Sequence, residues 1–227
     1  IRVEDSMRRV LVAYGAVDPE VFVIPSLIIV SVSRPNGEAA VRFKRILSRS
    51  TDMERFSRLN ALSRRLVREK PSYQDGIDAL NEILMTPKYP QWVNAPVYFI
   101  VAGMFTMLFG GEWFDGIFSG ICALTAWSVV FTAMRLQLHP FLRNIIVSSW
   151  SVFLAGVLER LFPVANMDLI IIGTFMLQVP GVQMTNGVRD LLSSDYIAGF
   201  IMLVEAGLIA VAMAIGAAFG LSALRFI

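Results

Sequence analysis

The sequence contains one cysteine and one histidine among its 227 residues. Cys122 alone excludes an intramolecular disulfide and a zinc site built from several cysteines. His139 is the only histidine, and residues 1–92 have none, which excludes a Ser/His/Asp triad there. No GxxxxGK[ST] segment occurs, so the chain offers no phosphate-binding loop of that kind for ATP. We therefore expect no metal, no cofactor and no ATP hydrolysis by this chain.

Charge is also scarce, and it is unevenly distributed. Only 17% of the residues are charged and 56% are hydrophobic, with a mean hydropathy of +0.62, which is typical of a membrane protein. Up to Trp92 there are 15 basic and 11 acidic residues, a net charge of +4, and beyond it there are 5 basic and 7 acidic residues, a net charge of −2. A basic N-terminal part therefore precedes an apolar part.

The N-terminal part, residues 1–92, has the patterns of a small α+β domain. A helix is predicted at 3–14 with Gly15 as its C-terminal cap, and helical spacing of leucines recurs between Asp52 and Leu84. Residues 21–32 are rich in β-branched side chains and predict a strand pair. The expected turns and the third strand lie at Pro25-Ser26, Arg34-Pro35-Asn36-Gly37 and 40–46.

The remainder, residues 93–227, predicts an α-helical membrane domain of about five spans. Each apolar run approaches the roughly 20 residues that cross a bilayer, although the first and fourth are short. The spans are expected at 94–109, 114–134, 142–162, 168–184 and 197–224.

Basic residues in the loops predict the orientation of these spans. They place the N-terminal domain and the loop 135–143 in the cytoplasm, and five spans then leave the C-terminus outside. An odd number of spans without an internal repeat suggests half of an assembly, completed by a second polypeptide or by further copies of the chain.

The fourth span contains a predicted helix break beside polar residues. Pro180-Gly181 lies about 12 residues into the span, or roughly 18 Å of helical rise. The residues after it would form a half-helix whose free amides face an anion, with Arg189 as a carboxylate partner. Alternatively, Pro-Gly simply ends the span, and Arg189 with Asp190 forms an exposed turn.

Glu205 is an isolated acid in the last span, where charge is costly and commonly functional. Helical geometry puts it on one face with Ala198, Ala212 and Gly216, small residues that let helices approach closely. Two roles remain open. The carboxylate either carries a coupling proton or makes a structural hydrogen bond to a neighbouring helix.

Other polar residues have both a functional and a structural interpretation. Asp115 either caps a helix or contacts a substrate, and capping is favoured because Asp is common at helix starts. His139 is interpreted as an interfacial residue, with a proton relay as the alternative. Hydroxyl groups either line a polar path or bond to their own helix backbone. They belong to Thr125, Ser128, Thr132, Ser148, Ser149 and Ser151.

An arginine-rich segment at 55–68 alternates its basic residues with acids and leucines. Such a helix contacts anionic lipid or nucleic acid, or it forms a solvated face of a packed helix. The alternation favours the solvated face, so no nucleic-acid partner is expected.

Several segments resemble the threonine/serine exporter family, in particular the larger subunit of its two-polypeptide members. The most specific segment is PGVQMTNGVRDLLSSDYIAGFIMLVEA, which is similar to the family's most recognisable block. The remaining segments follow the family's order. They are RVEDSMRRVLVAYG, VFVIPSLIIVSV, DMERFSRLNALSRRLVREKPSYQDGIDALNEI, PKYPQW and LFGGEWFDG.

The resemblance implies a subunit of an exporter in the bacterial cytoplasmic membrane, driven by the proton motive force. Expected substrates are small polar metabolites, either threonine or serine or small dicarboxylates such as succinate, and a smaller membrane subunit is the expected partner. The family's motif falls on Pro180, Gly181, Thr185, Asn186, Arg189, Asp190, Asp195 and Glu205.

These expectations assign a role to each motif residue. Arg189 would bind a substrate carboxylate, Thr185 and Asn186 would orient the substrate, and Glu205, Asp190 or Asp195 would carry the proton or pair with an ammonium group. Two other functions remain open, a membrane-anchored regulatory or enzymatic module and a passive metabolite channel.

Overall fold

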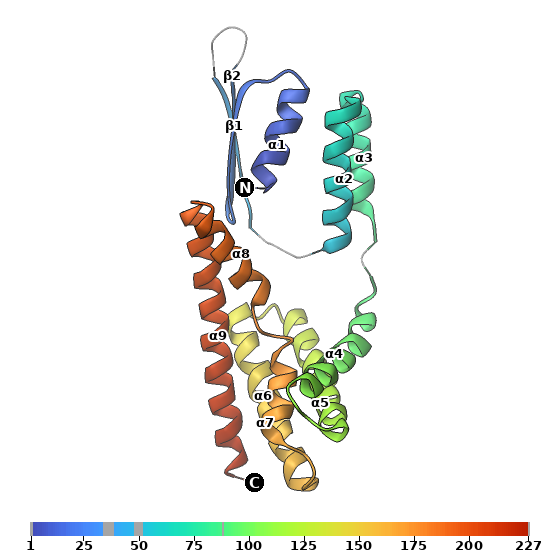
Figure 1. Ribbon diagram of the computed structural model, residues 1–227, viewed down its shortest axis with the longest axis vertical. Helices are drawn as coiled ribbons and strands as arrows, with labels where there is room; N and C mark the ends of the chain where they lie inside the picture. The colour runs from blue at the N-terminus through green and yellow to red at the C-terminus, as the bar shows by residue number, and fades with distance from the viewer. Residues whose placement is uncertain (1, 34–38, 48–51, 88, 227) are drawn as a thin grey trace. The chain divides into compact units, whose positions relative to one another are not determined.

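The computed structural model describes residues 2–33, 39–47, 52–87 and 89–226. The chain is mostly helical, with one small antiparallel sheet near its N-terminus (Figure 1). It forms two compact units. One contains Ile1–Lys88 with Asn186–Met202, and the other contains Tyr89–Thr185 with Leu203–Ile227.

The sheet has three antiparallel strands in the order β1-β2-β3. The strands are β1 (Val17–Ile24), β2 (Leu27–Ser33) and β3 (Ala39–Arg45). Ile24 pairs with Leu27, which confirms the predicted turn at Pro25-Ser26. The predicted turn at 34–37 lies outside the described residues. The register shifts near the start of β1, where Asp18 has a φ of 45°.

Helix α1 (Arg2–Ala13) lies on one side of this sheet (Figure 1). The Glu4 carboxylate accepts a hydrogen bond of 2.8 Å from the Val23 amide, which joins α1 to β1. The helix ends before Gly15, whose φ of +84° is a left-handed conformation that glycine adopts without a steric penalty. The predicted capping glycine is therefore confirmed.

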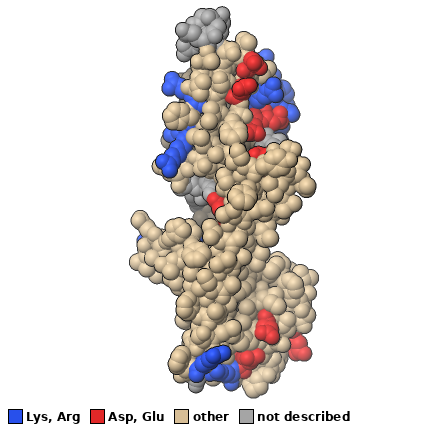
Figure 2. Space-filling view, turned by 90° about the vertical axis from the view of Figure 1, so that its left-hand side faces the viewer, with Lys and Arg blue, Asp and Glu red and all other residues tan. Residues whose placement is uncertain are grey.

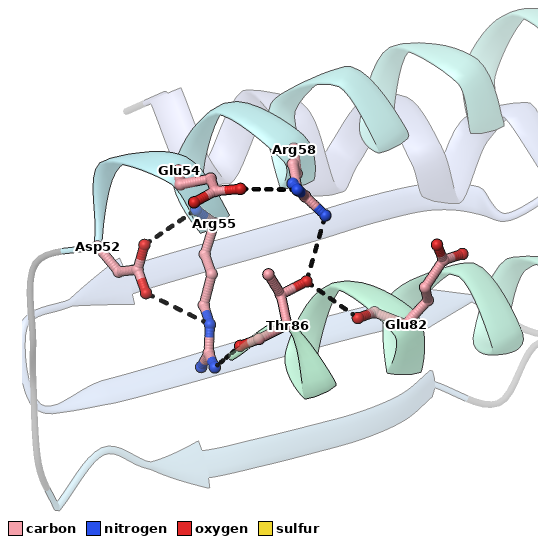
Figure 3. A network of polar contacts seen from close by, with 6 residues as sticks. All are labelled: Asp52, Glu54, Arg55, Arg58, Glu82 and Thr86. Carbon is pink, nitrogen blue, oxygen red and sulfur yellow. Dashed lines mark hydrogen bonds and ion pairs between the residues drawn. The ribbon is translucent and has the colours of Figure 1, made fainter. Parts of the chain in front are cut away.

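Helices α2 (Met53–Glu69) and α3 (Tyr73–Met85) form a hairpin with capped N-termini. The Asp52 side chain accepts from the Arg55 amide, and the Ser72 hydroxyl accepts from the Asp75 amide. Figure 3 shows how Arg55 and Arg58 of α2 also reach Thr86 at the end of α3. These polar contacts fix the two helices at one end of the hairpin.

The first two membrane helices are α4 (Asn94–Leu108), preceded by the 3-10 turn η1 (Gln91–Val93), and α5 (Trp113–Arg135). Asp115, with 3% of its surface exposed, accepts from the Glu112 amide at 3.0 Å and from the Asn166 amide at 2.8 Å. The first bond confirms the predicted cap. The second ties the start of α5 to the loop before α7 (Met167–Phe175).

Helices α6 (Pro140–Leu161) and α9 (Tyr196–Leu224) pack against each other in parallel. Gly216 lies against the Ile145 backbone, and Gly220 lies against Ser149 and Val152. Further along both helices, Leu224 contacts Gly156 and its carbonyl accepts from Arg160 at 2.8 Å. Since both helices advance in the same direction, their C-terminal ends lie together.

In the part of the chain that the structure describes, four helices are long and apolar enough to cross a membrane. They are Gln91–Leu108, Trp113–Arg135, Pro140–Leu161 and Tyr196–Leu224. The predicted fourth span, 168–184, is interrupted by the predicted break at Pro180-Gly181, and its residues are divided between two helices, α7 and the later α8 (Gly181–Leu192). Helix α7 has 9 residues, which rise only about 14 Å. The helix stops short because Pro180 has no amide to donate and disfavours helical backbone before it.

The segment between α6 and α9 must nevertheless return along the bundle, because those two helices are parallel. Its start lies beside the C-terminal end of α6, where the Met167 amide donates to Glu159 at 3.2 Å. Gln178 then meets Ser148, near the middle of α6. The return is therefore made by α7, a short linker and α8 (Gly181–Leu192) in succession.

We expect that Gly220→Ala will lower the stability of the membrane domain. A β-carbon at Gly220 would lie 2.6 Å from the Ser149 carbonyl oxygen and 2.8 Å from Val152 Cβ, so α6 and α9 must separate. Overpacking of this kind costs about 1–3 kcal/mol. The thermal unfolding midpoint of the purified chain in one detergent measures the effect.

Gly207→Ala is the matched control, because a β-carbon at Gly207 on the same helix meets nothing within 4 Å. Equal midpoints for the two variants would contradict the importance of the α6–α9 contact.

Candidate functional site

The candidate site is the break between α7 and α8. Residues 176–180 separate the two helices, and Pro180 is buried while the next residue, Gly181, is exposed. The Gln178 and Val179 amides donate to the Phe175 carbonyl, which closes the last turn of α7. A β-carbon at Gly181 would meet nothing within 4 Å, so the backbone at the start of α8 is accessible. The first amides of a helix have no partner within the helix.

The linker is held to α6 by one hydrogen bond between side chains. The buried Ser148 hydroxyl donates to Gln178 Oε1 at 3.0 Å. On the same stretch of α6, Ser148 Cβ lies against Gly216 of α9. Ser148 is therefore the point where α6, α9 and the linker meet.

Helix α7 is held by close contacts with α4 and α5. Gly173 has no room for a side chain, because a β-carbon there would overlap Thr106 and lie 2.7 Å from Ser119 Oγ. Thr174 donates to the Ile170 carbonyl at 2.9 Å, and its hydroxyl is 3.4 Å from Ser119 Oγ. These buried hydroxyls surround α7 just before the break.

Helix α8 shields its polar side and exposes its apolar side. Gln183 and Asn186 are half-buried and Asp190 has 6% of its surface exposed, and the three residues share one face of the helix. Large apolar side chains of α8 are instead exposed. Val182, Met184, Val188 and Leu192 are between 49% and 83% exposed. A helix in water has the reverse arrangement, so α8 has the pattern of a helix whose outer face meets lipid or another chain.

The predicted substrate-binding residues fall on two faces of α8. Arg189 and Thr185 are exposed and lie one helical turn apart, whereas Asn186 and Asp190 lie on the shielded face. An ion pair joins Arg189 on the exposed face to Asp190 on the shielded face. The guanidinium donates to Asp190 Oδ1 through Nε at 3.3 Å and through a terminal nitrogen at 3.1 Å.

Asp195 begins the last helix. Its carboxylate accepts from the Ala198 amide at 3.3 Å, the geometry of an N-terminal cap. The preceding Ser194 has a φ of 65°, and the Asp195 amide returns to the Asp190 carbonyl at 2.9 Å. This turn makes α8 and the start of α9 a tight hairpin. Gly199 allows it, since a β-carbon there would lie 2.7 Å from the Gly187 carbonyl oxygen.

Glu205 is half-buried and is the tenth residue of α9. It lies on the same side of the helix as the buried Ala198 and Ala212. Its side chain does interact with another group. The structure thus places Glu205 on the packed side of α9, as the helical spacing predicts.

Most of the other polar candidates have local roles. Thr125, Thr132 and Ser151 donate to carbonyls of their own helices, which is the structural alternative for them. Two of the hydroxyls also reach another helix or the linker: Thr125 accepts from Trp150 Nε1 of α6 at 3.1 Å, and Ser148 donates to Gln178 across the bundle. His139 caps α6, with its Nδ1 accepting from the Phe141 amide at 3.3 Å.

The sequence motifs do not identify Gln178 or the hydroxyl groups around Gly173 as parts of the site. Gly173-Thr174 interrupts an otherwise apolar run, and this interruption was the available signal. Which residues meet there depends on the packing of α4 and α5, which a single sequence does not specify. Among the described residues, no group of three or more His, Cys, Asp or Glu side chains is placed to hold a metal ion.

Comparison with known proteins identifies the family. Residues 1–224 match the family described as "Putative threonine/serine exporter". The chain belongs to this family. An uncharacterized protein of Schizosaccharomyces pombe is 27% identical over 177 residues, or 75% of this chain, and the chain spans about a fifth (21%) of that protein's length. No solved structure matches the chain.

Membership of this exporter family and the four long apolar helices agree on a multi-pass membrane protein of a transporter family. The family resemblance of the sequence is therefore confirmed.

We predict that Ser148→Ala will loosen the linker between α7 and α8. Removing the hydroxyl leaves the Gln178 carbonyl oxygen without its partner on α6, and such interhelical bonds contribute about 0.6–2 kcal/mol. Hydrogen exchange of the amides at 176–179 should therefore accelerate by roughly 3- to 30-fold.

Ser151→Ala provides the control on the same helix, since Ser151 donates only to the Val147 carbonyl of α6. Its linker amides should exchange at the original rate. If Ser148→Ala also leaves them unchanged, the hydrogen bond does not hold the linker.

Proposed function

We propose that the chain is a subunit of a secondary exporter of small polar metabolites, with its substrate site at the α7–α8 break. One observation carries the proposal: the shielded polar stripe of Gln183, Asn186 and Asp190 on a half-helix whose outer face is apolar. Burying polar groups costs free energy, and in membrane helices such groups commonly mark a transport path.

Arg189 is the proposed ligand of a substrate carboxylate. In the structure it is paired with Asp190 and its side chain is 51% exposed, so a substrate can reach it. A substrate carboxylate would compete with Asp190 for the guanidinium. Asn186 and Thr185, one turn away on the same helix, would orient the rest of the molecule.

Export driven by the proton motive force requires that a proton and the substrate exclude each other at the site. Once the substrate carboxylate has taken its place on Arg189, the Asp190 carboxylate would pair with a substrate ammonium group. A proton that enters from outside and neutralises Asp190 would then release the substrate. Glu205 is the second proposed proton carrier, because it lies on the packed side of α9. Asp195 already caps α9, which makes it the weaker proton carrier and leaves it to pair with a substrate ammonium group.

The chain would work in the bacterial cytoplasmic membrane with its N-terminal part in the cytoplasm, driven by the proton motive force. The basic N-terminal part supports this orientation. A smaller membrane subunit or a second copy would complete the site. The exposed apolar face of α8 supports such a partner, since Val182, Val188 and Leu192 have no cover in the structure.

Efflux measurements test the site. In cells or vesicles loaded with labelled threonine, serine or succinate, Arg189→Gln should lower the efflux rate at least about tenfold, because a charge-assisted bond to substrate contributes roughly 1.5–3 kcal/mol. Asp190→Asn should keep downhill exchange of substrate but lose its acceleration by a proton gradient. The Glu205→Gln variant, measured in the same assay, shows whether Glu205 contributes to proton coupling.

Arg225→Gln is the control, since Arg225 is exposed at the end of the chain's last helix, and it should export normally. Unchanged efflux in both Arg189→Gln and Asp190→Asn at normal expression would show that the site is elsewhere. Flux that an uncoupler does not reduce would identify a passive channel. Absence of any flux, with the partner subunit present, would favour a membrane-anchored module.

A further inference from the structure

Among the described elements of the N-terminal unit, β3 is the one whose charged side chains are all basic. Its sequence, AAVRFKR, contains Arg42, Lys44 and Arg45 and no acidic residue. None of these three side chains forms an ion pair with any residue that the structure describes.

The arginine-rich helix α2 makes the contrast clear, because four of its five arginines form ion pairs with nearby acids. Arg58 pairs with Glu54 at 2.6 Å, and Arg65 and Arg68 pair with Glu69 at 3.1 Å and 2.5 Å. These pairs support the solvated interpretation of α2 over a lipid-binding one. In Figure 2, the upper part of the molecule shows basic atoms along one edge and atoms of both signs along the other.

Strand β3 also carries large apolar side chains without cover. Phe43 is 77% exposed, Val41 is 57% exposed, and Leu47 just beyond the strand is 85% exposed. Phe43 pairs in register with Ile29, so it lies on the sheet face that α1 covers over β1 but not over β3. Because side chains alternate along a strand, Phe43 and Arg45 lie on this face and Arg42 and Lys44 lie on the other. A strand that meets a surface along its free edge presents both faces to it, which suits an interface that is part apolar and part anionic.

The strand's backbone is available as well. In the described sheet, β3 pairs only with β2, so the amides of its outer edge have no strand partner. Amide groups and guanidinium groups both bind phosphate oxygens, and arginine does so with two parallel hydrogen bonds.

We propose that β3 binds the anionic phospholipid headgroups of the membrane in which the chain's own helices are embedded. The occupant is a lipid surface because the strand combines three unpaired cations with exposed Phe43 and Leu47, and because the spans from residue 89 onward keep the N-terminal unit tethered to a bilayer. A soluble anion would match the cations but not the apolar side chains.

Charge sets the expected strength of this contact. A basic residue near an anionic surface contributes about 1 kcal/mol, so three residues together change the binding constant on the order of 100-fold. The attraction decays over a Debye length of about 10 Å at 0.1 M salt and 3 Å at 1 M, so salt should release the strand. This proposal requires that the N-terminal unit faces an anionic leaflet, but it does not require transport.

A spin label on Leu47→Cys, in a Cys122→Ser background, tests the contact in the full-length chain. The protein is reconstituted in nanodiscs of phosphatidylcholine, with or without phosphatidylglycerol, and collisions of the label with a water-soluble relaxation agent and with oxygen are compared. Anionic discs should shield the label from the water-soluble agent, and 1 M NaCl should restore its accessibility.

The triple substitution Arg42→Gln, Lys44→Gln and Arg45→Gln should abolish the shielding. The matched triple substitution Arg58→Gln, Arg65→Gln and Arg68→Gln removes the same charge from α2 and should preserve it, because those arginines are already paired. Both variants must elute as the parent chain does in gel filtration.

Several outcomes would overturn the proposal. Equal shielding in neutral and anionic discs means that protein, such as a second copy, covers β3. If millimolar inorganic phosphate at constant ionic strength restores the accessibility of the label, the strand binds free phosphate. Equal loss in the two triple variants means that net charge alone is responsible. Since no outcome depends on substrate efflux, the exporter function stands or falls separately.

Discussion

The parallel contact between α6 and α9 is the constraint on which the rest of the membrane domain depends. It exists because Gly216 and Gly220 present bare backbone to Ile145 and Ser149, so the two helices approach more closely than larger residues permit. Two parallel neighbours cannot be joined by a short hairpin. The intervening chain has to return along the bundle, and the space left for that return admits only the nine-residue α7, a linker and α8.

This return path determines which polar groups are presented at the α7–α8 break. A continuous helix satisfies its own backbone and presents side chains alone, whereas an interrupted helix also presents unpaired amides. The linker is held by Ser148 and Gln178 on one side, and α7 is held by Thr106 and Ser119 on the other. The Arg189–Asp190 pair then lies near the C-terminal end of α8, a short helix whose position is fixed by its contacts with neighbouring segments.

The sequence predicts the local elements well and the packing of the membrane domain poorly, for definite reasons. The Pro25-Ser26 turn, the capping glycine Gly15 and the cap at Asp115 follow from residue types that act within four positions of themselves. Hydropathy finds the long helices, and Pro180-Gly181 predicts the break in the run 168–184, but neither specifies that α7 ends at Phe175 or what holds the linker. The Ser148–Gln178 bond joins residues 30 positions apart, and no spacing rule reveals it.

The tight hairpin of α8 and α9 has a consequence for biosynthesis. Helix α7 rests on α4 and α5, which leave the ribosome before it does, but Gly187 of α8 packs against Gly199, which is made later. Helix α8 therefore has this packing partner only once α9 has been synthesised. A chain truncated before α9 would keep its earlier membrane helices but would lack the surface against which α8 packs.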